Sequence, residues 1–237
     1  MSWLNLHTRA LAPLHGPSLC EICRAWGDTA LCAECVARHA PARLRCTRCG
    51  LALAALDGAC EACLGDPPPF ERCCCVADYG FPWDRLIAEL KFHDRSALAT
   101  ALAALMARAL QAAEPAHAVD LILPVPLAPQ RLAERGYNQA WELARRLGPL
   151  LQTSARADVL SRPIATAAQH ELGRSERQRN LRGSFMVEPS QRHSLQGRRV
   201  ALVDDVMTTG ATVREASEVL LRAGAAAVEV WVFARTP

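Results

Sequence analysis

The chain has little of several things that would indicate particular functions. Its net charge is only +3, aromatic residues make up 5%, and Lys91 is the single lysine. A charge this small gives no strong case for a nucleic-acid surface. About half of the 237 residues are apolar and 22% are charged, which is the composition of a globular protein rather than a disordered one. The length allows one large domain or two modest ones.

Long hydrophobic runs are also missing. The longest alanine- and leucine-rich stretch, 97–113, is interrupted by Arg108 and is shorter than a bilayer requires. The first residues lack the apolar segment and the cleavage site of a secretory signal. We therefore expect a protein with no membrane span, located in the cytoplasm.

Cysteine is absent after Cys75, and all eleven cysteines lie between Cys20 and Cys75. In a cytosolic chain such a concentration favours metal binding over disulfides. Eight of the cysteines form four C-x-x-C pairs: Cys20/Cys23, Cys32/Cys35, Cys46/Cys49 and Cys60/Cys63. A C-x-x-C turn aims two thiolates at one ion, so two turns complete a tetrahedral structural zinc site. The spacing differs from that usual for iron–sulfur clusters, and four pairs exceed the single pair of a thioredoxin-like protein.

The order of the pairs predicts two zinc ribbons in tandem. Eight residues separate the first two pairs and ten separate the last two. A cross-braced arrangement, in which alternate pairs share an ion, is also compatible with the spacing. Gly50, directly after Cys49, suits a knuckle turn that needs a positive φ. The run 73–75 of three cysteines has no ligand spacing and fits either buried thiols or the start of a strand.

A proline-rich stretch, Asp66 to Pro69, ends the cysteine-rich part, because prolines cannot continue a helix or a central strand. We expect a zinc-ribbon domain over residues 1–69 and a second domain over 70–237. Helical spacing covers 83–92, 97–113, 138–150 and 212–222, and apolar runs of strand length cover 121–125, 199–203 and 228–233. Alternating strands and helices predict an α/β fold with a mainly parallel sheet, whose ligands lie beyond the carboxyl ends of the strands.

The most specific segment is V-A-L-V-D-D-V-M-T-T-G-A-T, residues 200–212. A buried strand delivers Asp204 and Asp205, a short loop follows, and a helix starts. The helix N-terminus and the loop amides and hydroxyls can hold a phosphate. The two carboxylates would repel a phosphate, so vicinal ribose hydroxyls are better partners for them.

Two further segments indicate phosphate chemistry. P-V-P-L at 124–127 is followed by Arg131 and Arg135, whose guanidinium groups match pyrophosphate oxygens. A polar stretch over 169–180 contains Arg174 and Arg177 and fits either a mobile flap that closes over a substrate or a solvated loop.

Residues 200–212 resemble the motif that binds 5-phosphoribosyl-1-pyrophosphate (PRPP) in type I phosphoribosyltransferases. With the cysteine ribbons, L-K-F at 90–92, P-V-P-L, R-G-Y-N-Q-A at 135–140 and the arginine-rich stretch, nearly the whole chain resembles the ComF family. The resemblance implies that Asp204 and Asp205 hold the ribose hydroxyls. It also implies that the 5-phosphate is held by Thr208, Thr209, Gly210, Ala211 and Thr212. Lys91, in the L-K-F element, fits either a phosphate contact or a surface helix lysine.

ComF proteins are associated with DNA uptake in natural competence, and this resemblance implies a similar association here. If the domain is catalytic, it transfers a phosphoribosyl group with release of pyrophosphate, and Mg²⁺ accompanies PRPP. The alternative is a non-catalytic PRPP or sugar-phosphate sensor, whose ribbons contact a competence helicase or single-stranded DNA. The sequence does not identify the acceptor or the oligomeric state.

Overall fold

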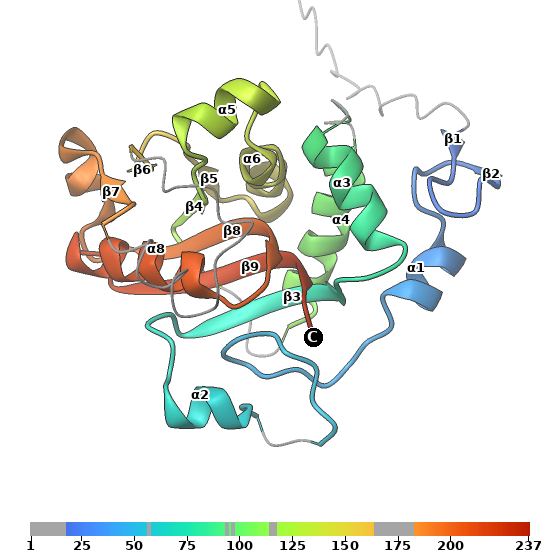
Figure 1. Cartoon of the computed structure of the whole chain (residues 1–237), viewed down its shortest axis with the longest axis horizontal. Helices are drawn as coiled ribbons and strands as arrows, with labels where there is room; N and C mark the ends of the chain where they lie inside the picture. The colour runs from blue at the N-terminus through green and yellow to red at the C-terminus, as the bar shows by residue number, and fades with distance from the viewer. Residues whose placement is uncertain (1–17, 56–57, 93–94, 96–97, 114–117, 164–182) are drawn as a thin grey trace, which may run out of the picture.

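A five-stranded parallel sheet forms the centre of the computed structural model, with strand order β3-β9-β8-β4-β5 (Figure 1). The structure describes residues 18–55, 58–92, 95, 98–113, 118–163 and 183–237. The strands of this sheet are β3 (Arg72–Asp78), β4 (Leu121–Pro124), β5 (Ser154–Ala155), β8 (Arg199–Met207) and β9 (Ala227–Arg235). The parallel α/β fold expected from the alternating pattern is confirmed.

Helices cover both faces of this sheet. They are α3 (Trp83–Phe92), α4 (Leu98–Gln111), α5 (Pro129–Arg135), α6 (Gln139–Leu151) and α8 (Ala211–Arg222). Apolar side chains alternate along β8: Ala201 and Val203 join the cluster under α3, α4 and α6, while Val200 and Leu202 join the cluster under α8. This alternation follows from the two-residue period of a strand and produces two hydrophobic layers. None of the described helices is both long enough and apolar enough to cross a bilayer.

The N-terminal part is built from short elements around the cysteines. It contains β1 (Ser18–Leu19), β2 (Trp26–Gly27), α1 (Ala33–His39) and α2 (Glu61–Gly65). The run of three cysteines at 73–75 lies in β3, which agrees with the strand interpretation. Two further short strands, β6 (Leu160–Ser161) and β7 (Met186–Val187), pair antiparallel, and the 3-10 helix η1 (Pro189–Leu195) follows them.

Local sequence signals account for several element ends. The Asn138 side chain accepts hydrogen bonds from the N–H groups of Ala140 and Trp141, so it is the N-cap that the sequence predicts for α6. Gly224 follows α8 with φ +110°, as expected for a residue that terminates a helix. The segment around Arg131 and Arg135 is the helix α5 rather than an extended turn, because Pro129 favours the first helical turn.

Glu229, a fully buried carboxylate on β9, connects three strands. Arg72 of β3 donates to its Oε1 at 2.9 Å, and Arg199 of β8 lies 3.6 Å from the same atom. The Trp231 indole N–H donates to Oε2 at 3.1 Å. Removing this buried carboxylate would take away an acceptor that Arg72, Arg199 and Trp231 share.

Glu229→Ala is expected to lower the free energy of unfolding by about 3 kcal/mol, the usual cost of breaking a buried ion pair from one side. Urea denaturation monitored by circular dichroism measures the change. Glu218→Ala is the matched control, since Glu218 pairs with Arg222 on the surface of α8, and it should change stability by less than about 0.5 kcal/mol. Equal effects of the two substitutions would contradict this role of Glu229.

Candidate functional site: an acidic pair and a phosphate loop

Asp204 and Asp205 lie in the last part of β8, which ends four residues beyond the apolar run 199–203. Asp205 is 2% exposed. Lys91 Nζ lies 2.6 Å from its Oδ2, and Gln139 Nε2 donates to its Oδ1 at 3.2 Å. Asp204 is partly exposed, and its Oδ1 accepts a hydrogen bond from the Asp205 N–H at 2.9 Å. Asp205 is therefore held by the protein, while Asp204 is the more available carboxyl.

The surroundings of this pair disfavour the charged form of the Asp204 carboxyl. Burial and then the charge of Asp205 raise the pKa of Asp204 well above its usual value, and Lys91 only partly offsets them. Burial alone would lower the pKa of Lys91, but the charge and hydrogen bond of Asp205 outweigh it and raise that pKa. Lys91 thus stays protonated in contact with Asp205, and it is not the surface helix lysine that the sequence also allowed.

The loop after β8 has the features of a phosphate site. Thr208 and Thr209 are exposed, Gly210 has φ +79°, and α8 starts at Ala211. The Thr209 hydroxyl accepts a hydrogen bond from the Ala211 N–H at 3.4 Å. Across the described residues, the N–H groups of Thr208, Thr209 and Gly210 have no hydrogen-bond acceptor within the chain. These amides, with those of the first turn of α8 that includes Thr212, are available to an anion.

Basic side chains from two helices, α3 and α5, lie near the acidic pair. Arg135 on α5 donates to Gln139 Oε1 at 3.0 Å and stacks on the Phe92 ring at 4.9 Å. Burial lowers the pKa of Arg135, Asp205 opposes that effect, and nearby Arg131 adds to it. The structure therefore brings Lys91, Arg131 and Arg135 together around the end of β8. Arg174 and Arg177 lie outside the described residues.

Sequence reasoning missed two residues of this site. Gln139 lies in the R-G-Y-N-Q-A element but was given no role, although it links Arg135 to Asp205. Arg162 follows β6, where it stacks on Phe185 at 5.2 Å. Its pKa is lowered by burial and by the charge of Arg131, whereas Glu215 and Asp204 raise it, which puts it near the acidic pair. A lone arginine beside a proline carries no pattern that would have revealed it.

Glu215 of α8 connects the phosphate loop helix to the residues just before β7. Its Oε1 accepts a hydrogen bond from the Ser184 N–H at 3.0 Å, and the Glu215 side chain is buried. Burial raises the pKa of this carboxyl more than the Ser184 and Gly183 amides lower it. The β6–β7 ribbon is thereby anchored to the same helix that begins at the phosphate loop.

Two groups of four cysteines form the second kind of candidate site. Cys20, Cys23, Cys32 and Cys35 make one group and Cys46, Cys49, Cys60 and Cys63 the other. Within each group the sulfur atoms all lie within 4.8 Å of one another. This grouping of the sulfurs is that of sequential pairing and not of the cross-braced alternative.

The surroundings of the sulfurs fit a structural zinc ion. The Cys32 N–H points to Cys20 Sγ at 3.4 Å, and the Cys60 N–H points to Cys46 Sγ at 3.3 Å. Burial would raise the pKa of Cys20 and of Cys46, but backbone N–H groups outweigh it and lower these values to about 6 and about 7. Burial raises the pKa of Cys35, Cys49 and Cys63, so the lowered values belong to one cysteine in each group. Four clustered sulfurs, with backbone N–H groups directed at one of them, fit the ligand set of a closed tetrahedral zinc site.

The comparisons with known proteins agree with this arrangement. The family model of the phosphoribosyl transferase domain matches residues 132–237. The DNA utilization protein YhgH of Escherichia coli K12 is 39% identical over 226 residues, which cover 93% of this chain and 98% of that protein. Competence protein F of Haemophilus influenzae is 34% identical over 193 residues, covering 80% and 84%. The glutamine PRPP amidotransferase of Bacillus subtilis aligns over 61% of this chain and 30% of its own, with 18% identity and a TM-score of 0.41, a weak similarity.

Fold and site together define a type I phosphoribosyltransferase-like protein with an N-terminal cysteine-rich region. With relatives of this identity along nearly their full length, the chain belongs to the ComF family.

Zinc analysis of paired substitutions tests the sequential pairing. The protein is expected to carry two zinc ions, and changing both Cys20 and Cys35 to serine should leave one, because both belong to one group. Changing both Cys20 and Cys49 should remove both ions. Elemental analysis by mass spectrometry counts them, and the reverse result in the two double variants would support cross-bracing.

Asp204→Asn is expected to stabilise the unliganded protein by about 1 kcal/mol at pH 8. A carboxyl with a raised folded-state pKa binds protons more tightly in the folded than in the unfolded chain. Stability therefore falls as the pH rises from about 4 through the raised value, and the amide removes this loss. Thermal unfolding at pH 5 and pH 8 checks it: the advantage of the variant should grow with pH. A variant that is less stable than the parent at pH 8 would contradict the raised pKa.

Proposed function

We propose that the chain binds PRPP with Mg²⁺ at the turn between β8 and α8 and transfers its phosphoribosyl group with release of pyrophosphate. The observation that carries this proposal is the exposed loop with unbonded N–H groups that directly follows the acidic pair. Of this pair, Asp205 is bound by Lys91 and Gln139, and Asp204 is available to a ligand. A phosphate needs N–H donors and vicinal hydroxyls need carboxyl acceptors, and a phosphorylated ribose requires both next to each other.

Roles follow from the surroundings of each side chain. Thr208, Thr209, Gly210, Ala211 and Thr212 would hold the 5-phosphate. Asp204 would accept hydrogen bonds from the ribose hydroxyls, with Asp205 beside it held in place by Lys91. Arg131 and Arg135 would meet the pyrophosphate, and Arg174 and Arg177 would act from the segment 164–182.

In the reaction, the bond from C1 of the ribose to pyrophosphate breaks and its electron pair leaves with pyrophosphate. A nucleophilic atom of the acceptor forms the new bond to C1 and loses a proton. The chain would work by positioning and by charge, without a covalent nucleophile. Asp204 and Asp205 suit a hard cation, and Mg²⁺ bound there with PRPP would neutralise pyrophosphate charge and relieve the repulsion within the acidic pair.

The names of the relatives, a DNA utilization protein and a competence protein, support a role in DNA uptake or use. We extend the family association to this chain as part of the proposal. The acceptor class is open: a nucleobase, an amine and a nucleic-acid component all satisfy the chemistry above.

Calorimetric titration of PRPP with Mg²⁺ into the zinc-loaded protein is expected to give saturable binding, and Asp204→Asn should weaken it by about tenfold or more, since two hydroxyl hydrogen bonds lose a charged acceptor. Asp158→Asn is the control, because Asp158 is an exposed residue paired with Arg156. No heat with the wild-type protein would refute the proposal. Binding without pyrophosphate release, across a panel of the three acceptor classes, would favour the non-catalytic sensor.

A further inference from the structure

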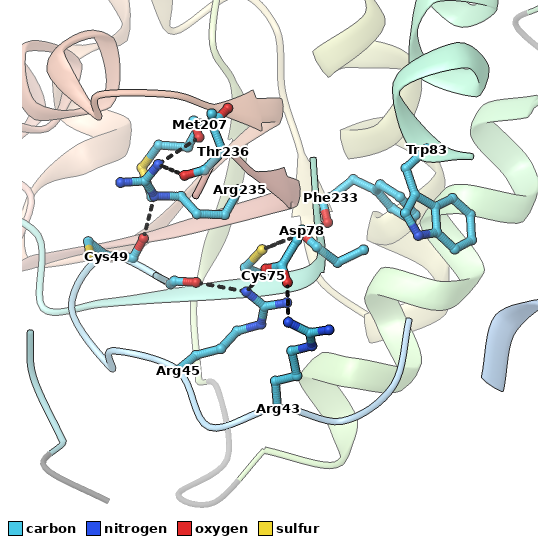
Figure 2. A network of polar contacts seen from close by, with 12 residues as sticks. Arg43, Arg45, Cys49, Cys75, Asp78, Trp83, Met207, Phe233, Arg235 and Thr236 are labelled. Carbon is cyan, nitrogen blue, oxygen red and sulfur yellow. Dashed lines mark hydrogen bonds and ion pairs between the residues drawn. The ribbon is translucent and has the colours of Figure 1, made fainter. Parts of the chain in front are cut away.

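Arg235, the last residue of β9, joins the second cysteine group to the phosphate loop (Figure 2). Its Nε donates to the carbonyl oxygen of Cys49 at 3.1 Å. Its Nη1 donates to the carbonyl oxygen of Met207 at 3.3 Å and also to that of Thr208. One guanidinium thus bonds on one side to a cysteine turn and on the other to the first peptide groups of the loop.

The cysteine turn that Arg235 reaches is fixed on the sheet. The Cys73 N–H of β3 donates to the Thr47 carbonyl oxygen at 2.8 Å. Gly50 packs so closely on β3 that a Cβ there would lie 3.0 Å from Cys75 Cβ. Arg45 donates to the Gly50 carbonyl oxygen at 3.0 Å, and Figure 2 shows Arg45 directed from that turn to Asp78 at the end of β3. The Cys49 carbonyl is therefore a defined point relative to the sheet.

The loop carbonyls that Arg235 holds determine where the loop amides point. In a trans peptide the C=O and the N–H of the next residue point in opposite directions. Holding the Thr208 carbonyl on Arg235 therefore directs the Thr209 N–H to the other side. The Met207 carbonyl also accepts a hydrogen bond from the Thr236 N–H at 3.0 Å, which fixes the Thr208 N–H in the same manner.

A second contact ties the helix after the loop to the same part of the chain. Arg214, in the first turns of α8, has its Nη2 3.0 Å from Asp66 Oδ2, and the same atom donates to the Asp66 carbonyl oxygen at 3.2 Å. Asp66 directly follows α2, which contains Cys63. Both ends of the loop are thus attached to segments that adjoin ligands of the second cysteine group.

We propose that Arg235 is a positioning residue that couples the second cysteine group to the phosphate loop. A metal bound by the second cysteine group would hold the Cys49 carbonyl in place. Arg235, bonded to that carbonyl, would then hold the Met207 and Thr208 carbonyls and so orient the amides of Thr208 and Thr209. The inference concerns the order of the unliganded loop, and only its consequence for PRPP affinity rests on the proposed function.

Nitrogen-15 NMR relaxation of the unliganded, zinc-loaded protein tests the coupling. Arg235→Ala should lower the order parameters of the Thr208 and Thr209 amides from about 0.85 to below about 0.6, the change from a rigid to a flexible backbone, with two zinc ions retained. Arg235→Lys should behave like Arg235→Ala, because an ammonium keeps the charge but lacks the fork that reaches both sides. Arg43→Ala is the matched control: Arg43 pairs with Asp78 at 3.0 Å in the same network (Figure 2), and its removal should leave the order parameters of the loop unchanged.

A double-mutant cycle separates coupling from a local effect. Cys60→Ser should lower the order parameters of the Thr208 and Thr209 amides in the wild-type background and add little in the Arg235→Ala background. Cys32→Ser, in the first cysteine group, should leave the loop unchanged in both. Additive effects of Cys60→Ser and Arg235→Ala, or full rescue by Arg235→Lys, would overturn the coupling.

Calorimetry then connects the loop to its ligand, with PRPP and Mg²⁺ affinity about tenfold weaker in Arg235→Ala and equal to wild type in Arg43→Ala. If the wild-type protein takes up no PRPP, the proposed function fails, while the relaxation measurement still decides the role of Arg235. Unchanged order parameters of the Thr208 and Thr209 amides in Arg235→Ala refute the inference whatever the calorimetry shows.

Discussion

Two adjacent carboxyls at the end of a buried strand are the constraint on which the site depends. β8 is the central strand of the sheet, and of the two carboxyls Asp205 is buried while Asp204 is partly exposed, so at least one charge is costly there. Lys91 forms an ion pair with Asp205 and Gln139 donates a hydrogen bond to it. Asp204 has no such contacts from these two residues, and its pKa is raised. A pair that is costly in the free protein and relieved by hydroxyl donors or a cation is what selective binding of a phosphorylated sugar requires.

Much of this could be predicted from sequence because the signals are local. Strand, acidic pair, loop and helix follow one another within 200–212, and each C-x-x-C pair fixes two ligands of one ion. The α/β class followed from periodicity. Lys91 and Asp205, by contrast, are over a hundred residues apart, and no local pattern shows that a lysine on α3 points to β8. Arg162 and Arg235 were missed for the same reason: each acts through tertiary contacts, and neither sits in a recurring spacing. The division at residue 69 stays a prediction.

The cysteine-rich part is stabilised in a different way from the sheet. Its strands and helices are two to seven residues long, too short to build a hydrophobic core of their own. In such segments metal ligation takes the place of a core and its binding free energy becomes folding free energy. The segments next to the second cysteine group, including the Cys49 carbonyl, should therefore be ordered only when that group binds its metal.

The match to the phosphoribosyl transferase family model begins at residue 132, but residues before this point also contribute to the site. Lys91 and β3 precede that point, β3 pairs along β9, and the Cys49 carbonyl bonds to the residue that holds the loop. A segment limited to 132–237 would keep the acidic pair and the loop but lose the cation on Asp205 and the support beneath the loop. The repulsion between Asp204 and Asp205 would then be without its nearest compensation. The N-terminal half therefore contributes to the electrostatics and the order of the proposed phosphate site, and is not only a neighbouring module.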